Sequence, residues 1–400
     1  MLASSELVRP PLVMPARSVV SCPVLITWLQ CDELKPCGNC TRRGEDCDLI
    51  KPKSDRRCPE CTAREEAGSA SESPADSVSY GAGQLFTPSD WSRDMYLMYH
   101  YSTYTGPDLA MTPELRIIWR NTIPEEAAKH PFLMHGILAI SAMHLADKDP
   151  SSTNEFLPLS IHHQNLAISS FRTALTAITE ENCTALFAQA AILSISCKLF
   201  SCIKARRQPP FRPSLDDIIE PYILTRGVGE VVGVAQHWIA KGPLQEFLHI
   251  HEAPRTSSAE QSATIKLHFE NMRELFRRSV ADATQLTALL ESTDVLQKIW
   301  QELERCEPNT EINPGVVWKW PNRTPLEYTI MLRQYHPQAL FLYAHFVMLS
   351  KLHDGYWYFR DWGSQAVGTV SAALPAEMRQ LILYPDFLDN RNLNLQQASS

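Results

Sequence analysis

Apolar residues recur with the spacing of α-helices over most of the chain between about residues 89 and 385. Two predicted helices each carry their apolar residues on one face, namely Ile161, Ile168, Phe171, Leu175 and Ile178 in the first and Leu186, Ala190, Leu193, Cys197 and Phe200 in the second. The segment Phe132–Leu145 is apolar almost all round, which predicts a buried central helix. No sustained alternation of apolar and polar residues indicates strands, so we expect an all-α fold.

Capping residues predict where several of these helices begin. Ser89 and Asp90 precede a helix with Trp91, Met95 and Met98 on one face, and His130-Pro131 precedes the apolar segment. Thr112 stands before a proline at the first helical position. Thr324-Pro325-Leu326-Glu327 has the spacing of a capping box and predicts a long helical segment to about Leu352.

Composition divides the chain into five segments. Residues 1–30 have no clear pattern, and residues 31–61 hold a cluster of cysteines. Residues 62–88 are rich in Ala, Ser, Gly, Glu and Pro, so we expect a disordered linker. A large helical regulatory domain is predicted over residues 89–385, followed by a C-terminal tail over residues 386–400.

Charge and motif searches narrow the classes of function. The net charge is −8, yet residues 1–64 carry ten Lys and Arg against eight Asp and Glu, so any DNA contact is expected in this N-terminal part. The sequence has no HExxH, G-x-S-x-G or Walker A motif, and we expect no enzymatic activity. No run of 18 apolar residues occurs, so we expect no membrane span.

Seven of the eleven cysteines lie between residues 22 and 61. Four of them, Cys31, Cys37, Cys40 and Cys47, have the spacing C-x5-C-x2-C-x6-C. Four thiolates in so short a span can close one tetrahedral zinc site. Such clustering beside a cysteine-poor remainder indicates a metal site in a reducing compartment. We therefore predict that these four cysteines bind Zn.

The run CDELKPCGNCTRRGEDC, residues 31–47, resembles the second half of the fungal zinc binuclear cluster, in which six cysteines hold two zinc ions. A second resemblance, to the sterol uptake control-like branch of the same transcription factors, rests on DMYLMYHY at 94–101, HPFLMHGILA at 130–139 and SAMHLA at 141–146. The resemblance implies a nuclear, zinc-dependent, sequence-specific regulator of RNA polymerase II transcription. Sterol or secondary-metabolism genes are candidate targets.

The same resemblance implies partners. DNA with CGG-type half-sites is expected, with Lys35, Arg42 and Arg43 contacting phosphates. The resemblance also allows a homodimer, although no heptad repeat of a coiled coil occurs in residues 62–88. The branch further implies a sterol-like ligand, which Trp119 and the helix Phe132–Leu145 would line unless their side chains simply fill a core.

The first half of the family's cluster is missing from the sequence. No C-x2-C precedes Cys31, and no Lys or Arg occurs between Arg17 and Lys35, where the family has its base-reading basic run. Either residues 1–30 reflect a mispredicted first exon, which we favour, or DNA reading has been lost. In the second case the chain would be a non-DNA-binding helical protein that senses a ligand or titrates a partner.

Other residues allow alternative interpretations. Cys58 and Cys61 with Cys37 and Cys40 have the spacing of a zinc ribbon, although an unpaired C-x2-C is the simpler interpretation. His249, His251 and Glu252 are weak metal-ligand candidates. For His130, His135 and His144 we expect packing or capping roles, and for Cys183, Cys197, Cys202 and Cys306 we expect small core residues.

Overall fold

The computed structural model describes residues 88–207, 213–248, 263–306, 312, 314–353, 355–360, 362–384 and 388. The regular secondary structure of these residues consists of helices, and no strand occurs among them, which confirms the predicted all-α fold. The predicted segments 1–30 and 31–61, the linker up to residue 87 and nearly all of the predicted tail lie outside the described residues. Pro88, the last residue of the predicted linker, begins the first described helix.

The described chain begins with a run of helices that ends at a long central pair. These elements are α4 (Pro88–His100), η2 (Tyr101–Thr105), α5 (Gly106–Leu109), α6 (Pro113–Ile117), η3 (Ile118–Thr122), α7 (Ile123–Ala127), α8 (Pro131–Lys148), η4 (Pro150–Ser152), α9 (Thr153–Leu175), α10 (Cys183–Arg207) and α11 (Leu215–Ile239). The remaining elements are η5 (Gln245–Leu248), α12 (Ala263–Ser279), α13 (Ala283–Glu304), α14 (Pro314–Arg323), α15 (Leu326–Arg333), α16 (Pro337–Leu349), η6 (Ser350–His353), α17 (Trp362–Ala373) and α18 (Ala376–Arg379).

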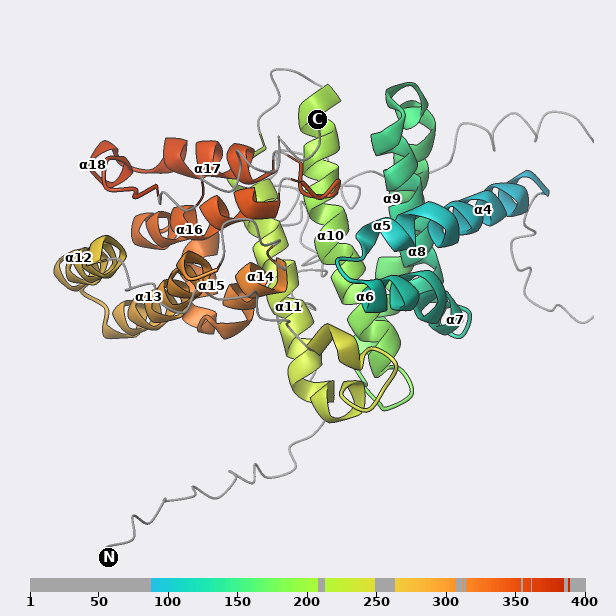
Figure 1. Cartoon of the computed structure of the whole chain (residues 1–400), viewed down its shortest axis with the longest axis horizontal. Coiled ribbons are helices and arrows are strands. Elements are labelled where there is room, and N and C mark those ends of the chain that lie inside the picture. Colours follow the sequence, from blue (N-terminus) through green and yellow to red (C-terminus); the bar gives the residue numbers. More distant parts are fainter. Residues whose placement is uncertain are drawn as a thin grey trace, which may run out of the picture.

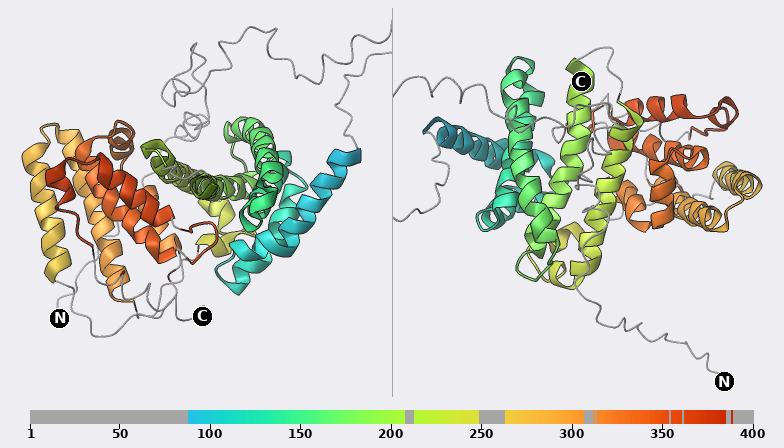
Figure 2. Two further views of the ribbon diagram at one scale, coloured as in Figure 1. Left: turned by 90° about the horizontal axis from the view of Figure 1, so that it is seen from above. Right: turned by 180° about the vertical axis from the view of Figure 1, so that it is seen from behind.

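Helices α10 and α11 pack side by side through the middle of the molecule (Figure 1). Helices α4 to α9, here called the N-terminal half, lie on one side of this pair, and α12 to α18, the C-terminal half, lie on the other (Figure 2). Helix α8 contacts α10, whereas α14 and α15 contact α11. The central pair therefore connects two groups of helices through one continuous hydrophobic core.

One helix in each half is buried almost all round. Helix α8 buries most of its side chains, which confirms the prediction of a central helix over Phe132–Leu145. Helix α16 is its counterpart, because every residue from Gln338 to Leu349 is buried. Both begin with a proline at the first helical position, which needs no hydrogen bond from its nitrogen. Their uniform apolarity follows from contacts on every side.

The start of α6 agrees with the cap predicted at Thr112, whereas the start of α15 differs from the capping box predicted at Thr324. Thr112 caps α6, since its side chain accepts a hydrogen bond from the Leu115 amide at 3.2 Å. The predicted capping box at Thr324 was wrong, because Pro325 takes the N-cap position of α15. The Thr324 hydroxyl instead donates to the Pro321 carbonyl at 3.0 Å, and the residue is buried. The same hydroxyl also pairs with the hydroxyl of the distant Tyr222, so it is used at the end of α14 and in a tertiary contact and not as a cap of α15.

The predicted long helix to about Leu352 was also wrong as a single element. Helix α15 ends at Arg333 and α16 begins at Pro337. Between them Tyr335 has a φ of 55°, a left-handed conformation that a tyrosine rarely adopts. Proline disfavours helical backbone in the residue before it, here His336, so the break is local in origin.

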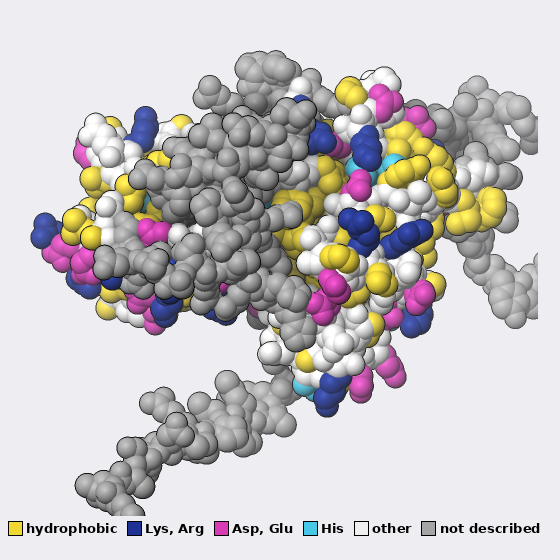
Figure 3. Space-filling model, in the orientation of Figure 1, with side chains coloured by type: hydrophobic (Ala, Val, Ile, Leu, Met, Phe, Trp, Pro, Cys, Tyr) yellow, Lys and Arg dark blue, Asp and Glu magenta, His cyan; other side chains and the backbone are white. Residues whose placement is uncertain are grey.

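Helix α4 forms as predicted, but the face that we singled out points largely to solvent. Trp91 is 64% exposed and Met95 is 45% exposed, while Met98 is partly buried. Leu97, His100 and Tyr101 are buried in this region. Hydrophobic side chains accordingly gather on the surface over the α4 and α9 side of the molecule (Figure 3).

Candidate functional site

The predicted zinc and DNA contacts lie outside the described residues. This holds for the zinc ligands Cys31, Cys37, Cys40 and Cys47 and for the phosphate contacts Lys35, Arg42 and Arg43, as well as for the weaker candidates Cys58, Cys61, His249, His251 and Glu252. Zinc binding and DNA contact by these residues therefore stay predictions. Within the described ranges no group of three or more His, Cys, Asp or Glu side chains is placed to hold a metal ion.

The downstream cysteines are core residues in the structure, as predicted. Cys183, Cys202 and Cys306 are buried and Cys197 is half-buried. Burial raises the pKa of the Cys183 thiol. A thiol held in its neutral form is a poor metal ligand and a poor nucleophile, so this cysteine has the properties of a small apolar side chain.

The region of the sterol-like pocket considered from the sequence is filled with side chains. Trp119 is 3% exposed, and its ring meets Phe247 edge-on with 5.4 Å between centroids. Phe132 of α8 packs against Phe171 of α9 at 5.8 Å. Packing therefore accounts for the apolar character of both Trp119 and α8. The sterol-like ligand stays a prediction.

His144 of α8 joins the N-terminal half to a segment near the end of the chain. Its Nδ1 lies 2.9 Å from the Thr105 hydroxyl, and its ring stacks on Trp357 at 4.1 Å. The Trp357 indole N–H donates to the Asp108 carbonyl at 3.1 Å. Desolvation lowers the pKa of His144 to about 3, so the ring is neutral at ordinary pH. These contacts agree with a packing role.

The other two histidines of this region also have local partners. His130 lies 3.2 Å from Glu126, one turn before it. His135 Nδ1 lies 3.1 Å from Nδ1 of His163, whose Nε2 lies 3.2 Å from Asp94 on α4. Burial lowers the pKa of His163 to about 4. The pair thus fixes α4 against α8 and α9 through neutral rings.

A hydrogen-bonded network holds the turn between α14 and α15 against α11. Arg226 donates to the carbonyl oxygens of Pro321, at 3.4 Å, and Thr324. The buried Tyr222 hydroxyl pairs with the Thr324 hydroxyl. Carbonyls at the C-terminal end of a helix lack hydrogen-bond donors within the helix, and the Arg226 side chain provides the donors here. Arg226 therefore has a structural role.

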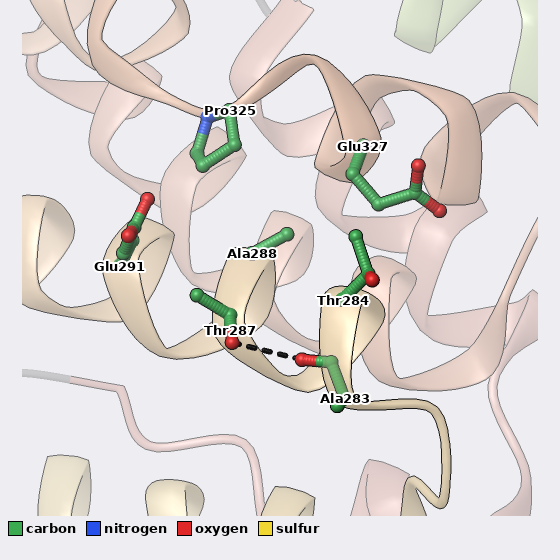
Figure 4. Close-up of a pocket in the computed structure, with 7 residues that line it drawn as sticks. All are labelled: Ala283, Thr284, Thr287, Ala288, Glu291, Pro325 and Glu327. Atoms are coloured by element: carbon green, nitrogen blue, oxygen red, sulfur yellow. Dashed lines mark hydrogen bonds between the residues drawn. The ribbon is translucent and has the colours of Figure 1, made fainter.

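An open groove lies between α13 and the start of α15, with a volume of about 400 Å³ (Figure 4). Its lining is Ala283, Thr284, Thr287, Ala288, Glu291, Pro325 and Glu327. The Thr287 hydroxyl is occupied by the Ala283 carbonyl at 2.8 Å. The groove shares no residue with Phe132–Leu145, so it is not the pocket that the sequence suggested.

Lys198 is a residue that the sequence analysis missed. It lies on α10, is 3% exposed, and has its amine over two aromatic rings of the C-terminal half. A single charge inside the apolar stretch Cys183–Phe200 was the available signal. That stretch also makes α10 the one described helix long and apolar enough to cross a membrane, over Cys183–Lys204. Its most apolar window is 78% buried within the protein, as in a core helix.

Residues 96–215, from α4 to the start of α11, match the family model of the fungal specific transcription factor domain. The matched part contains the buried helix α8, the histidine contacts around it and Lys198. Two curated proteins align with part of the chain. The sterol uptake control protein 2 of Saccharomyces cerevisiae is 35% identical over 133 residues, and that of Candida albicans is 40% identical over 106 residues.

These alignments cover a small part of each protein. They include 30% and 25% of this chain and 14% of the length of either relative. The similarity is thus partial. It supports the resemblance inferred from the motifs at 94–146, and the zinc-cluster resemblance of residues 31–47 rests on sequence alone.

Proposed function

We propose that this chain is a regulator of RNA polymerase II transcription that acts in the nucleus. The observation that carries the proposal is the combination of two features in one chain. A four-cysteine segment precedes a helical domain whose residues 96–215 match the fungal specific transcription factor domain. In such a protein the N-terminal segment would bind DNA, and the helical domain would regulate that activity. We propose no catalytic role.

In this proposal Cys31, Cys37, Cys40 and Cys47 bind one zinc ion, because four thiolates complete one tetrahedral shell. Lys35, Arg42 and Arg43 contact phosphates of a duplex with CGG half-sites. Phosphate contacts position a protein on DNA, whereas base contacts give sequence specificity. The absent basic run between Arg17 and Lys35 predicts weak discrimination between sequences by this chain.

That absence also favours a second candidate function, a helical protein that regulates transcription without binding DNA itself. It would act by sensing a ligand or by titrating a partner. The names of the two relatives suggest sterols as the first ligands to test. In this case a panel of sterols should raise the thermal unfolding midpoint of the full chain, and an unchanged midpoint across the panel removes the sterol from the proposal.

Fluorescence anisotropy with the zinc-loaded full chain distinguishes the two candidates. The probes are a duplex with CGG half-sites and a scrambled duplex, each with and without a chelator and at two salt concentrations, since phosphate contacts weaken as salt rises. Specific, chelator-sensitive binding that Cys37→Ser abolishes and Cys197→Ser retains supports the first candidate. Equal binding to both duplexes, or none, contradicts sequence-specific recognition and leaves the second.

A further inference from the structure

Lys198 occupies a junction between the central helix α10 and the C-terminal half. Its Nζ lies 4.0 Å from the ring centroid of Trp318 on α14 and 5.2 Å from that of Phe359. Its one described hydrogen bond goes to the Ser194 hydroxyl, one turn earlier on α10, at 3.3 Å. The amine thus has aromatic surfaces from the C-terminal half around it and a single neutral acceptor.

No described carboxylate is among the charged groups that act on the Lys198 amine. From α10 the titratable neighbours are the thiols of Cys197 and Cys202, and from η6 the neighbour is His353. From α11 comes Thr225, whose hydroxyl pairs with Ser194 at 2.7 Å. His353 is fully buried, and desolvation together with the charge of Lys198 lowers its pKa to about 3, so it supplies no charge of its own.

Two opposing effects decide the state of this amine. Removing an ammonium from water without a counter-ion is strongly unfavourable. The faces of Trp318 and Phe359 attract the cation and offset part of this penalty. The penalty is the larger effect, and burial lowers the pKa of Lys198 to about 7. The amine therefore exchanges its proton within the range of pH that a cell experiences.

We propose that Lys198 is a proton-controlled contact that sets how tightly α14 and the segment around Phe359 pack against α10. The neutral amine is compatible with its apolar surroundings, so α14 and the segment around Phe359 stay packed against α10. The protonated amine needs water, which it reaches only when Trp318 and Phe359 move away from α10. Proton concentration would thereby adjust the arrangement of the helical domain, whether or not the N-terminal segment binds DNA.

The sign and size of the effect follow from linkage. The opened state takes up the proton with an ordinary lysine pKa of 10.5, and the packed state does so only near 7. Opening is therefore favoured as the pH falls from 10.5 towards 7 and changes little below that. Between pH 8.5 and pH 6 the opening equilibrium should rise roughly thirtyfold.

Amide hydrogen exchange of the full chain tests the proposal. The reporters are the amides of Phe359, Arg360 and Trp362, which bond to carbonyls at 2.7–3.2 Å within this segment. After correction for intrinsic exchange chemistry, wild-type protection should fall by about thirtyfold from pH 8.5 to pH 6. Lys198→Met, which is always neutral and of similar size, should keep its protection at both values.

Two further variants make the result specific to this amine. Lys204→Met removes a half-buried lysine of the same helix, whose amine lies over Phe200 at 5.2 Å, and should behave as wild type. Lys198→Arg, which stays charged, should show low protection at both pH values. A wild-type protein whose protection does not change with pH, or a Lys198→Met variant that still changes, overturns the proposal, even if the arginine variant fails to fold.

Discussion

Two glycines of α17 predict opposite effects of the same substitution. Gly363 is buried, and a Cβ atom added there would lie 2.8 Å from the Lys351 nitrogen and 3.0 Å from the Ser350 carbonyl carbon. Both are backbone atoms of η6, so no side chain can turn away to relieve the contact. Gly368 lies on the same helix, is exposed, and has no atom within 4 Å of the corresponding position.

Whether alanine raises or lowers the stability at each site depends on the relative size of two effects. Replacing glycine by alanine inside a helix stabilises it by about 1 kcal/mol through backbone entropy. At Gly368 this term acts alone, so Gly368→Ala should be more stable by up to about 1 kcal/mol. At Gly363 the overlap forces α17 away from η6 and costs about 1–3 kcal/mol. Gly363→Ala should therefore be the less stable variant despite its better helix propensity.

Urea unfolding followed by tryptophan fluorescence measures both variants, and Trp362 next to Gly363 lies in the affected contact. The expected result is a lower midpoint for Gly363→Ala and an equal or higher midpoint for Gly368→Ala, with the same slope. A Gly363→Ala protein at least as stable as Gly368→Ala would refute the close packing of α17 on η6.

Three further predictions concern metal, pH and core packing. The full chain should hold one zinc ion by elemental analysis and Cys40→Ser should hold none; a metal-free wild type contradicts the four-thiolate site. His144 has a pKa lowered from 6.5 to about 3, so it resists protonation that the unfolded chain accepts. This residue should lower the stability by about 1.6 kcal/mol between pH 6.5 and pH 5, and His144→Phe should reduce the pH dependence in urea titrations by that amount. Trp320→Phe removes a 2.8 Å bond to the Ser292 carbonyl and should cost about 2–3 kcal/mol, whereas Trp91→Phe at an exposed position should change the midpoint little; equal effects would contradict the assigned burial.

Helix positions and buried helices could be predicted because they depend on local pattern. Helix α8 could be predicted because its residues are almost uniformly apolar. The cap at Thr112 could be predicted because it involves only the three residues that follow it. The capping box at Thr324 failed for the opposite reason. Its hydroxyl is used by Tyr222, about a hundred positions away along the chain, and no local pattern reports such a contact.

The exposed face of α4 illustrates the same limit. Trp91, Met95 and Met98 share a helical face, and the sequence alone does not say whether another helix covers it. In the described structure α8 and α9 reach Leu97 and Asp94 instead. Periodicity predicts that a helix forms, while the register of its contacts depends on partners that come later in the chain.

Polar residues within the core are the least predictable part of the candidate site and also the most informative about regulation. Burying Lys198 without a counter-ion lowers the stability of the packed domain, and Met at this position would fill similar space without that cost. In the sequence Lys198 is a single basic residue within an apolar helix, and this pattern is equally consistent with an exposed side chain. The burial that lowers the pKa of this amine depends on residues such as Trp318 and Phe359, which come from more than a hundred positions away along the chain. The proposed regulatory property of Lys198 therefore depends on tertiary structure, whereas the proposed zinc site of residues 31–47 was predicted from cysteine spacing alone.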